Sequence, residues 1–204
     1  MSEYALIHIS DWEADLSRPR SEDKRRAILD AALRVFAERG IASAPTSAIS
    51  TAAGVAEGSL FTYFKTKDEL MNALYVELRM EFSEILTDFP HEADARTRLK
   101  YIWDEYLELG AAHPERLKVL EQLRASGRLF KERETPNFAL LQVLKATGEA
   151  AQGSELRDAP TEYLVLMFRA MAEITVEYLN ANPESAGVCG ELGFKMVWNG
   201  LTGN

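Results

Sequence analysis

Residues 53–70 of the chain read AGVAEGSLFTYFKTKDEL, and the glycine near the start of this stretch separates two short helical segments. The segments are Thr46–Ala53 before Gly54 and Ala56–Phe64 after it. A glycine at such a junction adopts a positive φ without steric cost, so the second helix can leave at a steep angle to the first. The stretch therefore predicts a helix-turn-helix.

The second of these helices has one apolar side and one small, polar and aromatic side. Its apolar stripe comprises Val55, Leu60 and Phe64. The residues left to face outward are Glu57, Ser59, Thr62 and Tyr63. A short helix with such an outer face fits the major groove of DNA.

The run from Ile49 to Leu70 resembles the DNA-binding signature of the TetR (tetracycline-repressor-like) family in residue type and spacing. The matching positions are Ile49, Ala53-Gly54-Val55, Gly58-Ser59-Leu60-Phe61, Tyr63-Phe64, Lys67 and Leu70. With the helix before it, the resemblance covers roughly a quarter of the chain, from about Lys24 to Leu70. It implies an all-α protein with an N-terminal three-helix DNA-binding domain and a larger helical domain for ligand binding and dimerisation.

The residues expected to contact DNA are Thr46, Glu57, Gly58, Ser59, Phe61, Thr62, Tyr63 and Lys67. Hydroxyl groups can bond base edges or phosphate, and Phe61, where the family usually has tyrosine, could contact a thymine methyl. Glu57 either accepts a hydrogen bond from a cytosine amino group or only complements the helix N-terminus. Lys67 is the expected phosphate contact. Ala44-Pro45 replaces two hydroxyl residues usual in the family, so whether Ser43 or Thr46 binds phosphate stays open.

Charge is distributed unevenly along the chain. The whole protein carries a net charge of −9, yet residues 18–67 hold nine Lys/Arg against five Asp/Glu, a local +4, and the remainder carries −13. Because charges more than about 10 Å apart are largely screened at ordinary salt, the local sign governs attraction to phosphate. This asymmetry favours a small DNA-reading domain attached to an acidic sensor domain.

Other function classes find little support in the residues. The three histidines are widely separated and show no metal-ligand spacing, and no phosphate-binding glycine loop or nucleophile elbow is present. The sequence therefore predicts neither an enzyme nor a metal or cofactor site. A single cysteine, Cys189, fits a reducing cytoplasm, and the longest apolar run, Tyr163–Phe168, is too short to span a bilayer.

Apolar spacing and Pro/Gly punctuation predict about nine helices. Their approximate ranges are 21–39, 45–53, 56–64, 67–89, 93–112, 114–128, 136–152, 160–180 and 183–201. We expect a flexible arm at 1–19, because Pro19 should end any helix that reaches it. The DNA-binding domain is predicted at 20–66 and the ligand-binding and dimerisation domain at 67–204.

The two last helices predict a homodimer. The 160–180 helix is apolar on nearly all sides, so one face requires its own domain and the other a partner chain. The expected interface residues are Leu164, Phe168, Leu192 and Met196. A four-helix interface is also what the family resemblance implies.

These patterns predict a ligand-responsive regulator that binds a near-palindromic double-stranded DNA operator as a dimer. We expect it to be a repressor. A small, largely apolar effector would release it. Candidate pocket residues are Trp103, Tyr106, Phe138, Met167 and Met171, for each of which core packing is the alternative and the more common role. Arg124 and His113 either orient a polar group or are surface residues. The alternative is a constitutive helical DNA-binding protein without a ligand.

Overall fold

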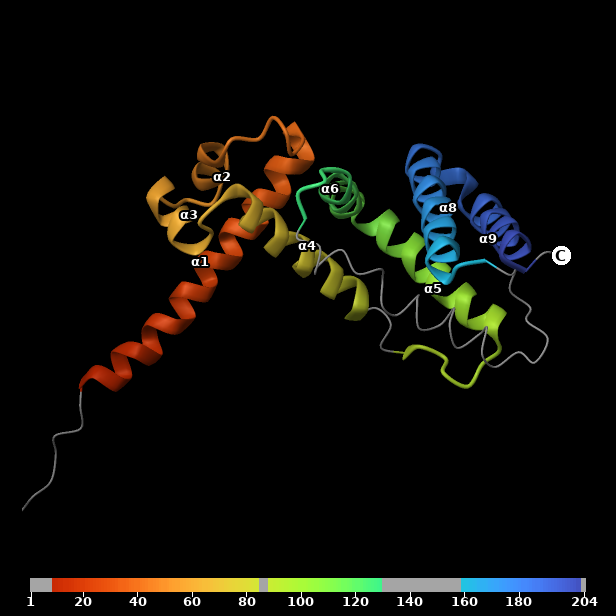
Figure 1. The fold of residues 1–204 in the computed structure, drawn as a ribbon, viewed down its shortest axis with the longest axis horizontal. Coiled ribbons are helices and arrows are strands. Elements are labelled where there is room, and N and C mark those ends of the chain that lie inside the picture. Colours follow the sequence, from red (N-terminus) through yellow and green to blue (C-terminus); the bar gives the residue numbers. More distant parts are fainter. Residues whose placement is uncertain (1–8, 85–87, 130–158, 203–204) are drawn as a thin grey trace, which may run out of the picture. The chain divides into compact units, whose positions relative to one another are not determined.

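The computed structural model describes residues 9–84, 88–129 and 159–202, and within them it is entirely helical, as predicted (Figure 1). The α-helices are α1 (Ile9–Arg39), α2 (Thr46–Ala52), α3 (Glu57–Tyr63), α4 (Lys67–Glu84), α5 (Ala95–Ala112), α6 (Pro114–Ala125), α8 (Thr161–Ala181) and α9 (Ala186–Thr202). A 3-10 turn, η3 (Pro183–Ser185), precedes α9. In the same ranges, no helix combines the length and apolar character needed to span a membrane.

The first helix begins earlier than the sequence predicts. α1 starts at Ile9 and continues through Pro19, so the expectation that this proline ends the helix is wrong. Proline removes one backbone donor and crowds the preceding turn, which costs about 3 kcal/mol in a helix interior but does not forbid the helix. The predicted helix at 136–152 lies outside the described residues.

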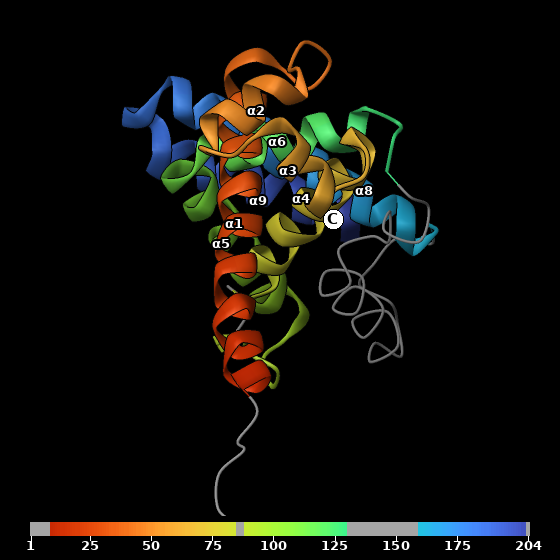
Figure 2. The ribbon, with the colours of Figure 1, turned by 90° about the vertical axis from the view of Figure 1, so that its left-hand side faces the viewer.

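The chain divides into two compact units, Met1–Leu74 and Tyr75–Asn204, and the boundary falls within α4. In unit 1, α2 and α3 lie beside the C-terminal half of α1, as Figures 1 and 2 both show. Ile28, Phe36, Ile49 and Leu60 are fully buried between these helices. Leu60 and Phe64 of the apolar stripe predicted for the α3 segment are therefore buried in the core of unit 1.

Gly54 makes the turn between α2 and α3, with φ +66°. Its N–H donates to the Thr51 carbonyl at 3.1 Å, and the Val55 N–H donates to the Ser50 carbonyl at 3.0 Å. This pair of bonds is a Schellman motif, which satisfies the last carbonyls of α2 and requires the left-handed conformation at the glycine. The predicted role of Gly54 is confirmed.

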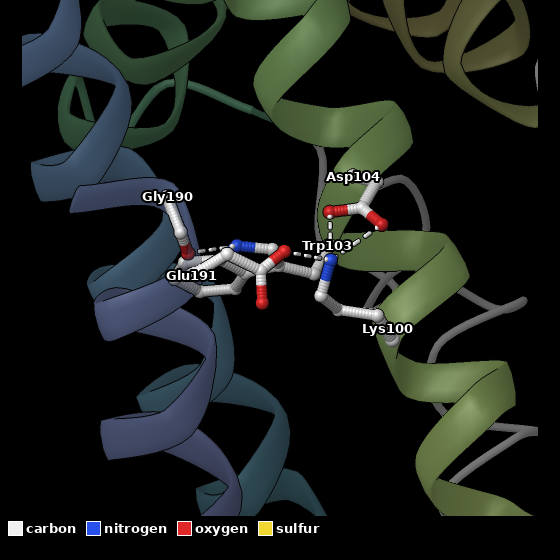
Figure 3. A network of polar contacts seen from close by, with 5 residues as sticks. All are labelled: Lys100, Trp103, Asp104, Gly190 and Glu191. Atoms are coloured by element: carbon white, nitrogen blue, oxygen red, sulfur yellow. Dashed lines mark hydrogen bonds and ion pairs between the residues drawn. The ribbon is translucent and has the colours of Figure 1, made fainter. Parts of the chain in front are cut away.

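Unit 2 is built on the contact of α5, α8 and α9. Trp103 of α5 is fully buried at its centre and meets Phe168 of α8 edge-on, with ring centroids 5.8 Å apart. Its indole N–H donates to the Gly190 carbonyl of α9 at 3.0 Å, so the largest side chain of this core is also hydrogen-bonded (Figure 3).

A surface ion network joins α5 to α9 beside this tryptophan (Figure 3). The Lys100 ammonium lies 2.8 Å from Asp104 on α5 and 2.7 Å from Glu191 on α9. Although burial opposes it, these two carboxylates raise the pKa of Lys100. The network is half-exposed, so we assign the cohesion of α5 and α9 chiefly to the apolar core beneath it.

Candidate DNA-binding site

α3 presents the outer face that the sequence predicts. Leu60 is fully buried behind the helix, whereas Glu57, Gly58 and Thr62 are exposed and Phe61 keeps 40% of its surface in solvent. Ser59 and Tyr63 are half-buried at the edges of this face. The short helix is held from behind by its core contacts, which leaves hydroxyl, aromatic and carboxylate groups available on one side.

The Thr62 hydroxyl donates to the Gly58 carbonyl one turn earlier, at 3.1 Å. Its own lone pairs remain available to accept a hydrogen bond, for instance from a base amino group. A Cβ added at Gly58 would meet nothing within 4 Å, so this glycine leaves the outer face of α3 open to a large, flat surface.

Two of the candidate DNA contacts bind each other. The Thr46 hydroxyl at the start of α2 donates to the Glu57 Oε1 at the start of α3, over 3.3 Å. The hydroxyl has one proton, so Thr46 cannot give it to a phosphate while it holds Glu57. The bond fixes the position of the carboxylate, whose second oxygen keeps its capacity to accept.

Lys67 has a different role from the one predicted. Its ammonium donates to the carbonyls of Ile41 and Ala44, each at 2.6 Å, and lies 5.8 Å from the centroid of the Phe36 ring. These contacts tie the first turn of α4 to the loop after α1. Lys67 is therefore a structural residue of unit 1, and its contact with a phosphate stays a prediction.

Other cations surround the α3 face in unit 1. Arg25 stacks over the Phe64 ring at 5.6 Å, and Arg34 donates to the Ala52 carbonyl at 3.4 Å. Lys24, Arg26 and Lys65 are exposed. The excess of basic residues predicted for this part of the chain is thus present at the surface, where it can attract phosphate.

Comparison with known proteins agrees with this geometry. A profile of bacterial regulatory proteins of the tetR family matches residues 28–74, the segment from α1 into α4. The "Fatty acid metabolism regulator protein" of Bacillus subtilis (strain 168) is 29% identical over 145 residues, which span 66% of this chain and 74% of that protein. Residues 28–74 therefore form the DNA-binding segment of a tetR-family regulatory protein.

Solved TetR-family structures share the fold over most of the chain. A TetR-family transcription regulator from Marinobacter aquaeolei superimposes with a TM-score of 0.78 at 23% identity, covering 90% of this chain and 98% of that one. The regulator FadR of Bacillus subtilis, solved in complex with stearoyl-CoA, gives a TM-score of 0.63 at 17% identity, covering 86% and 98%. The likeness of fold extends through unit 2.

The pocket residues expected in unit 2 separate in the structure. Trp103 is fully buried in the core, whereas Met167 on α8 is 43% exposed, and contact of either residue with a ligand stays a prediction. Periodicity placed them on one side of a helix without showing what covers that side. Met171 and Tyr106 are half-buried against the core, and Phe138 lies outside the described residues.

The expected dimer residues divide in the same way. Leu192 and Met196 of α9 keep 52% and 56% of their surface exposed, as an interface requires. Leu164 and Phe168 of α8 are 5% and 2% exposed and belong to the core of their own chain, so they are not interface residues. On α8 the exposed apolar side chains are instead Tyr163, Leu166, Met167, Ile174 and Tyr178.

An open groove of about 610 Å³ runs beside the ion network of Figure 3. Its walls include Arg96, Tyr101 and Phe194, and among the described residues they include none of the predicted pocket residues. Lys100, which also lines the groove, is already paired with two carboxylates.

Proposed function

We propose that the protein is a cytoplasmic, dimeric repressor that binds a near-palindromic operator through α3 and releases it when a small effector binds unit 2. The observation that carries the proposal is the outer face of α3, where Phe61, Thr62 and the carboxylate of Glu57 stand exposed on a helix fixed by Leu60. No core function explains an exposed phenylalanine beside two polar groups. A major groove offers each of them a partner, including a thymine methyl for the ring.

Dimerisation is supported by the apolar stripes that α8 and α9 leave uncovered. On α9, Val188, Leu192 and Met196 recur every four residues and are 74%, 52% and 56% exposed. On α8, Ile174 and Tyr178 are 62% and 49% exposed at the same spacing. Exposed apolar stripes on two adjoining helices are typical of an obligate four-helix interface, and such an interface would present two copies of α3 to the DNA.

An effector site in unit 2 is supported by the relatives. The Bacillus subtilis relative is a fatty acid metabolism regulator, and the FadR structure contains stearoyl-CoA. We infer that this chain also responds to a small, largely apolar compound. In the mechanism we propose, the compound shifts the dimer toward a state whose α3 helices no longer match successive major grooves, and about 1–3 kcal/mol of coupling suffices.

The experiment that tests the proposal selects binding sites for the full-length protein from a pool of randomised duplexes. We expect a two-fold symmetric site whose half-sites are centred about 34 Å, or one helical turn, apart. Phe61→Ala should weaken binding to the selected site about tenfold or more, because a base contact is worth about 1–3 kcal/mol.

Met80→Ala is the matched control, because Met80 is also an exposed apolar residue, 61% in solvent, but lies on α4. Enrichment of no site, enrichment of an asymmetric one, or equal losses in the two variants would refute the proposed docking.

A further inference from the structure

Four charged side chains gather inside unit 2, away from the DNA-reading face. Glu121 and Arg124 come from α6, and Arg169 and Glu173 come from α8. Their side chains keep only between 19% and 35% of their surface exposed. Burial of four charges in one place is costly, and a network of this kind is weak evidence for stability. This cost indicates that the four-residue cluster does more than hold α6 and α8 together.

Two guanidinium groups converge on one oxygen of this cluster. The Oε1 atom of Glu173 lies 2.9 Å from Arg169 Nε and 3.3 Å from Arg124 Nη1. The same Arg124 Nη1 is also ion-paired with Glu121 Oε1. The cluster therefore already contains a carboxylate that is ion-paired with two arginines.

Glu173 is the weakly held member. Burial, together with the neighbouring Glu121 carboxylate, raises the pKa of Glu173 to about 7 against the pull of the two arginines. Arg124, by contrast, stays charged, since Glu121 and the Tyr75 hydroxyl raise its pKa although burial opposes this. Near neutral pH about half of the molecules thus carry a protonated Glu173, which leaves two guanidiniums facing a single carboxylate.

Aromatic rings border the cluster from the remaining helices. Tyr75 of α4 is 3% exposed and hydrogen-bonded to Arg124. Tyr106 of α5 is half-buried, and burial together with the Glu173 and Glu121 carboxylates raises the pKa of its hydroxyl against the effect of the two arginines. A polar group flanked by aromatic and apolar surface fits a compound with a charged head and an apolar body.

We propose that Glu173 occupies the place of an effector carboxylate, and that Arg124 and Arg169 bind the anionic head of an amphipathic carboxylic acid. This deepens the effector site of the proposed function and rests on it. The incoming carboxylate takes over the contacts of Glu173 Oε1, and the displaced glutamic acid keeps its proton. An apolar chain attached to the ligand then lies along the surface beside Tyr106.

The test compares three compounds of equal chain length on the full-length protein by isothermal titration calorimetry: octanoate, octan-1-ol and octylammonium. We expect octanoate to bind and the other two to bind at least tenfold more weakly. Arg124→Gln and Arg169→Gln should each weaken octanoate at least tenfold. At about pH 8, where Glu173 is mainly ionised, Glu173→Gln should strengthen it about tenfold, because the variant keeps the shape of the side chain but removes the competing carboxylate.

The matched control is Arg116→Gln, which breaks the Arg116–Glu81 pair between α6 and α4 in the same unit, at similar exposure. It should change octanoate affinity less than twofold. Equal weakening by Arg116→Gln and Arg124→Gln would overturn the proposal, as would preferential binding of octylammonium or the alcohol, or the absence of binding by saturated carboxylates of any chain length from four to about sixteen carbons.

The gain expected for Glu173→Gln keeps the test decisive if an arginine variant does not fold, since no loss of structure can strengthen binding. Site selection with the unliganded wild type runs in parallel. An intact operator preference with no carboxylate binding would overturn this inference alone, whereas absence of operator binding would overturn the proposed function.

Discussion

Lys67→Met is the perturbation whose effect the structure defines most sharply. The substitution keeps the apolar stem of the side chain but removes the ammonium from the Ile41 and Ala44 carbonyls, both 2.6 Å away. Ile41 and Ala44 are buried residues, 6% and 1% exposed, so water cannot easily replace the lost donor. A hydrogen bond to a charged group contributes about 1.5–3 kcal/mol, and an unsatisfied buried acceptor costs about 1–3 kcal/mol.

The two bonds share one ammonium and the loop can relax, so we expect a loss of about 2–4 kcal/mol in the free energy of unfolding of unit 1. Urea denaturation followed by circular dichroism, with hydrogen exchange to assign the loss to unit 1, measures it. Lys65→Met is the control, because Lys65 is exposed, and it should cost no more than about 0.5 kcal/mol. Equal losses in the two variants would refute the structural role of Lys67.

Salt dependence separates this role from the phosphate contact that the sequence predicts. Each neutralised phosphate contributes about −0.9 to the slope of log K against log salt concentration on duplex DNA. A structural Lys67 lowers operator affinity in the methionine variant but leaves that slope unchanged. A slope reduced by about one in Lys67→Met would instead show that Lys67 contacts a phosphate.

Three further predictions concern unit 2. Gly193→Ala should destabilise it by about 1–3 kcal/mol in urea, because the new methyl group would lie 2.8 Å from the core indole, whereas Gly200→Ala, which meets nothing within 4 Å, should be nearly neutral. Leu192→Glu combined with Met196→Glu should convert the dimer to a monomer in sedimentation velocity, and a persistent dimer would move the interface elsewhere. The pKa of Glu173 is raised, so between about pH 4.5 and 7 the folded state binds more protons than the unfolded state, and stability should fall as the pH rises through this window. Glu173→Gln should remove this part of the pH dependence of the free energy of unfolding.

The sequence was sufficient for the helix-turn-helix because each residue there meets one dominant constraint. Gly54 alone can take φ +66° without strain, and Leu60 and Phe64 are the large apolar residues available to bury α3. The structural role of Lys67 could not be predicted, because a lysine at a helix start can reach a phosphate or a carbonyl with equal ease. Only the fold shows that the loop after α1 brings two carbonyls to it.

α8 shows why the dimer face and the pocket could not be derived in the same way. Its apolar residues run nearly all round the helix, so periodicity gives no direction. Phe168 faces Trp103 and the core, and the adjacent Met167 faces solvent, although either order satisfies the sequence pattern. The Glu121–Arg124–Arg169–Glu173 cluster was missed for a related reason, because charges on two helices separated in sequence reveal a common site only once α6 and α8 are packed.

α4 offers a physical route from the effector to the DNA reader. Lys67 at its start is bound within unit 1, and Tyr75, eight positions later, is hydrogen-bonded to Arg124 in the polar cluster of unit 2. A ligand carboxylate that binds Arg124 competes for this bond, so Tyr75 is the group through which binding can act on α4.

Tyr75→Phe should retain operator binding and octanoate binding but reduce the coupling between them. The expected wild-type coupling is about 1–3 kcal/mol, or about 5–150-fold in operator affinity, and in the variant it should fall to less than about threefold. Fluorescence anisotropy of labelled operator with and without saturating octanoate measures it, with Tyr178→Phe on the exposed face of α8 as the control. If coupling in Tyr75→Phe stays at the wild-type level, octanoate binding at the cluster affects operator binding through a helix other than α4.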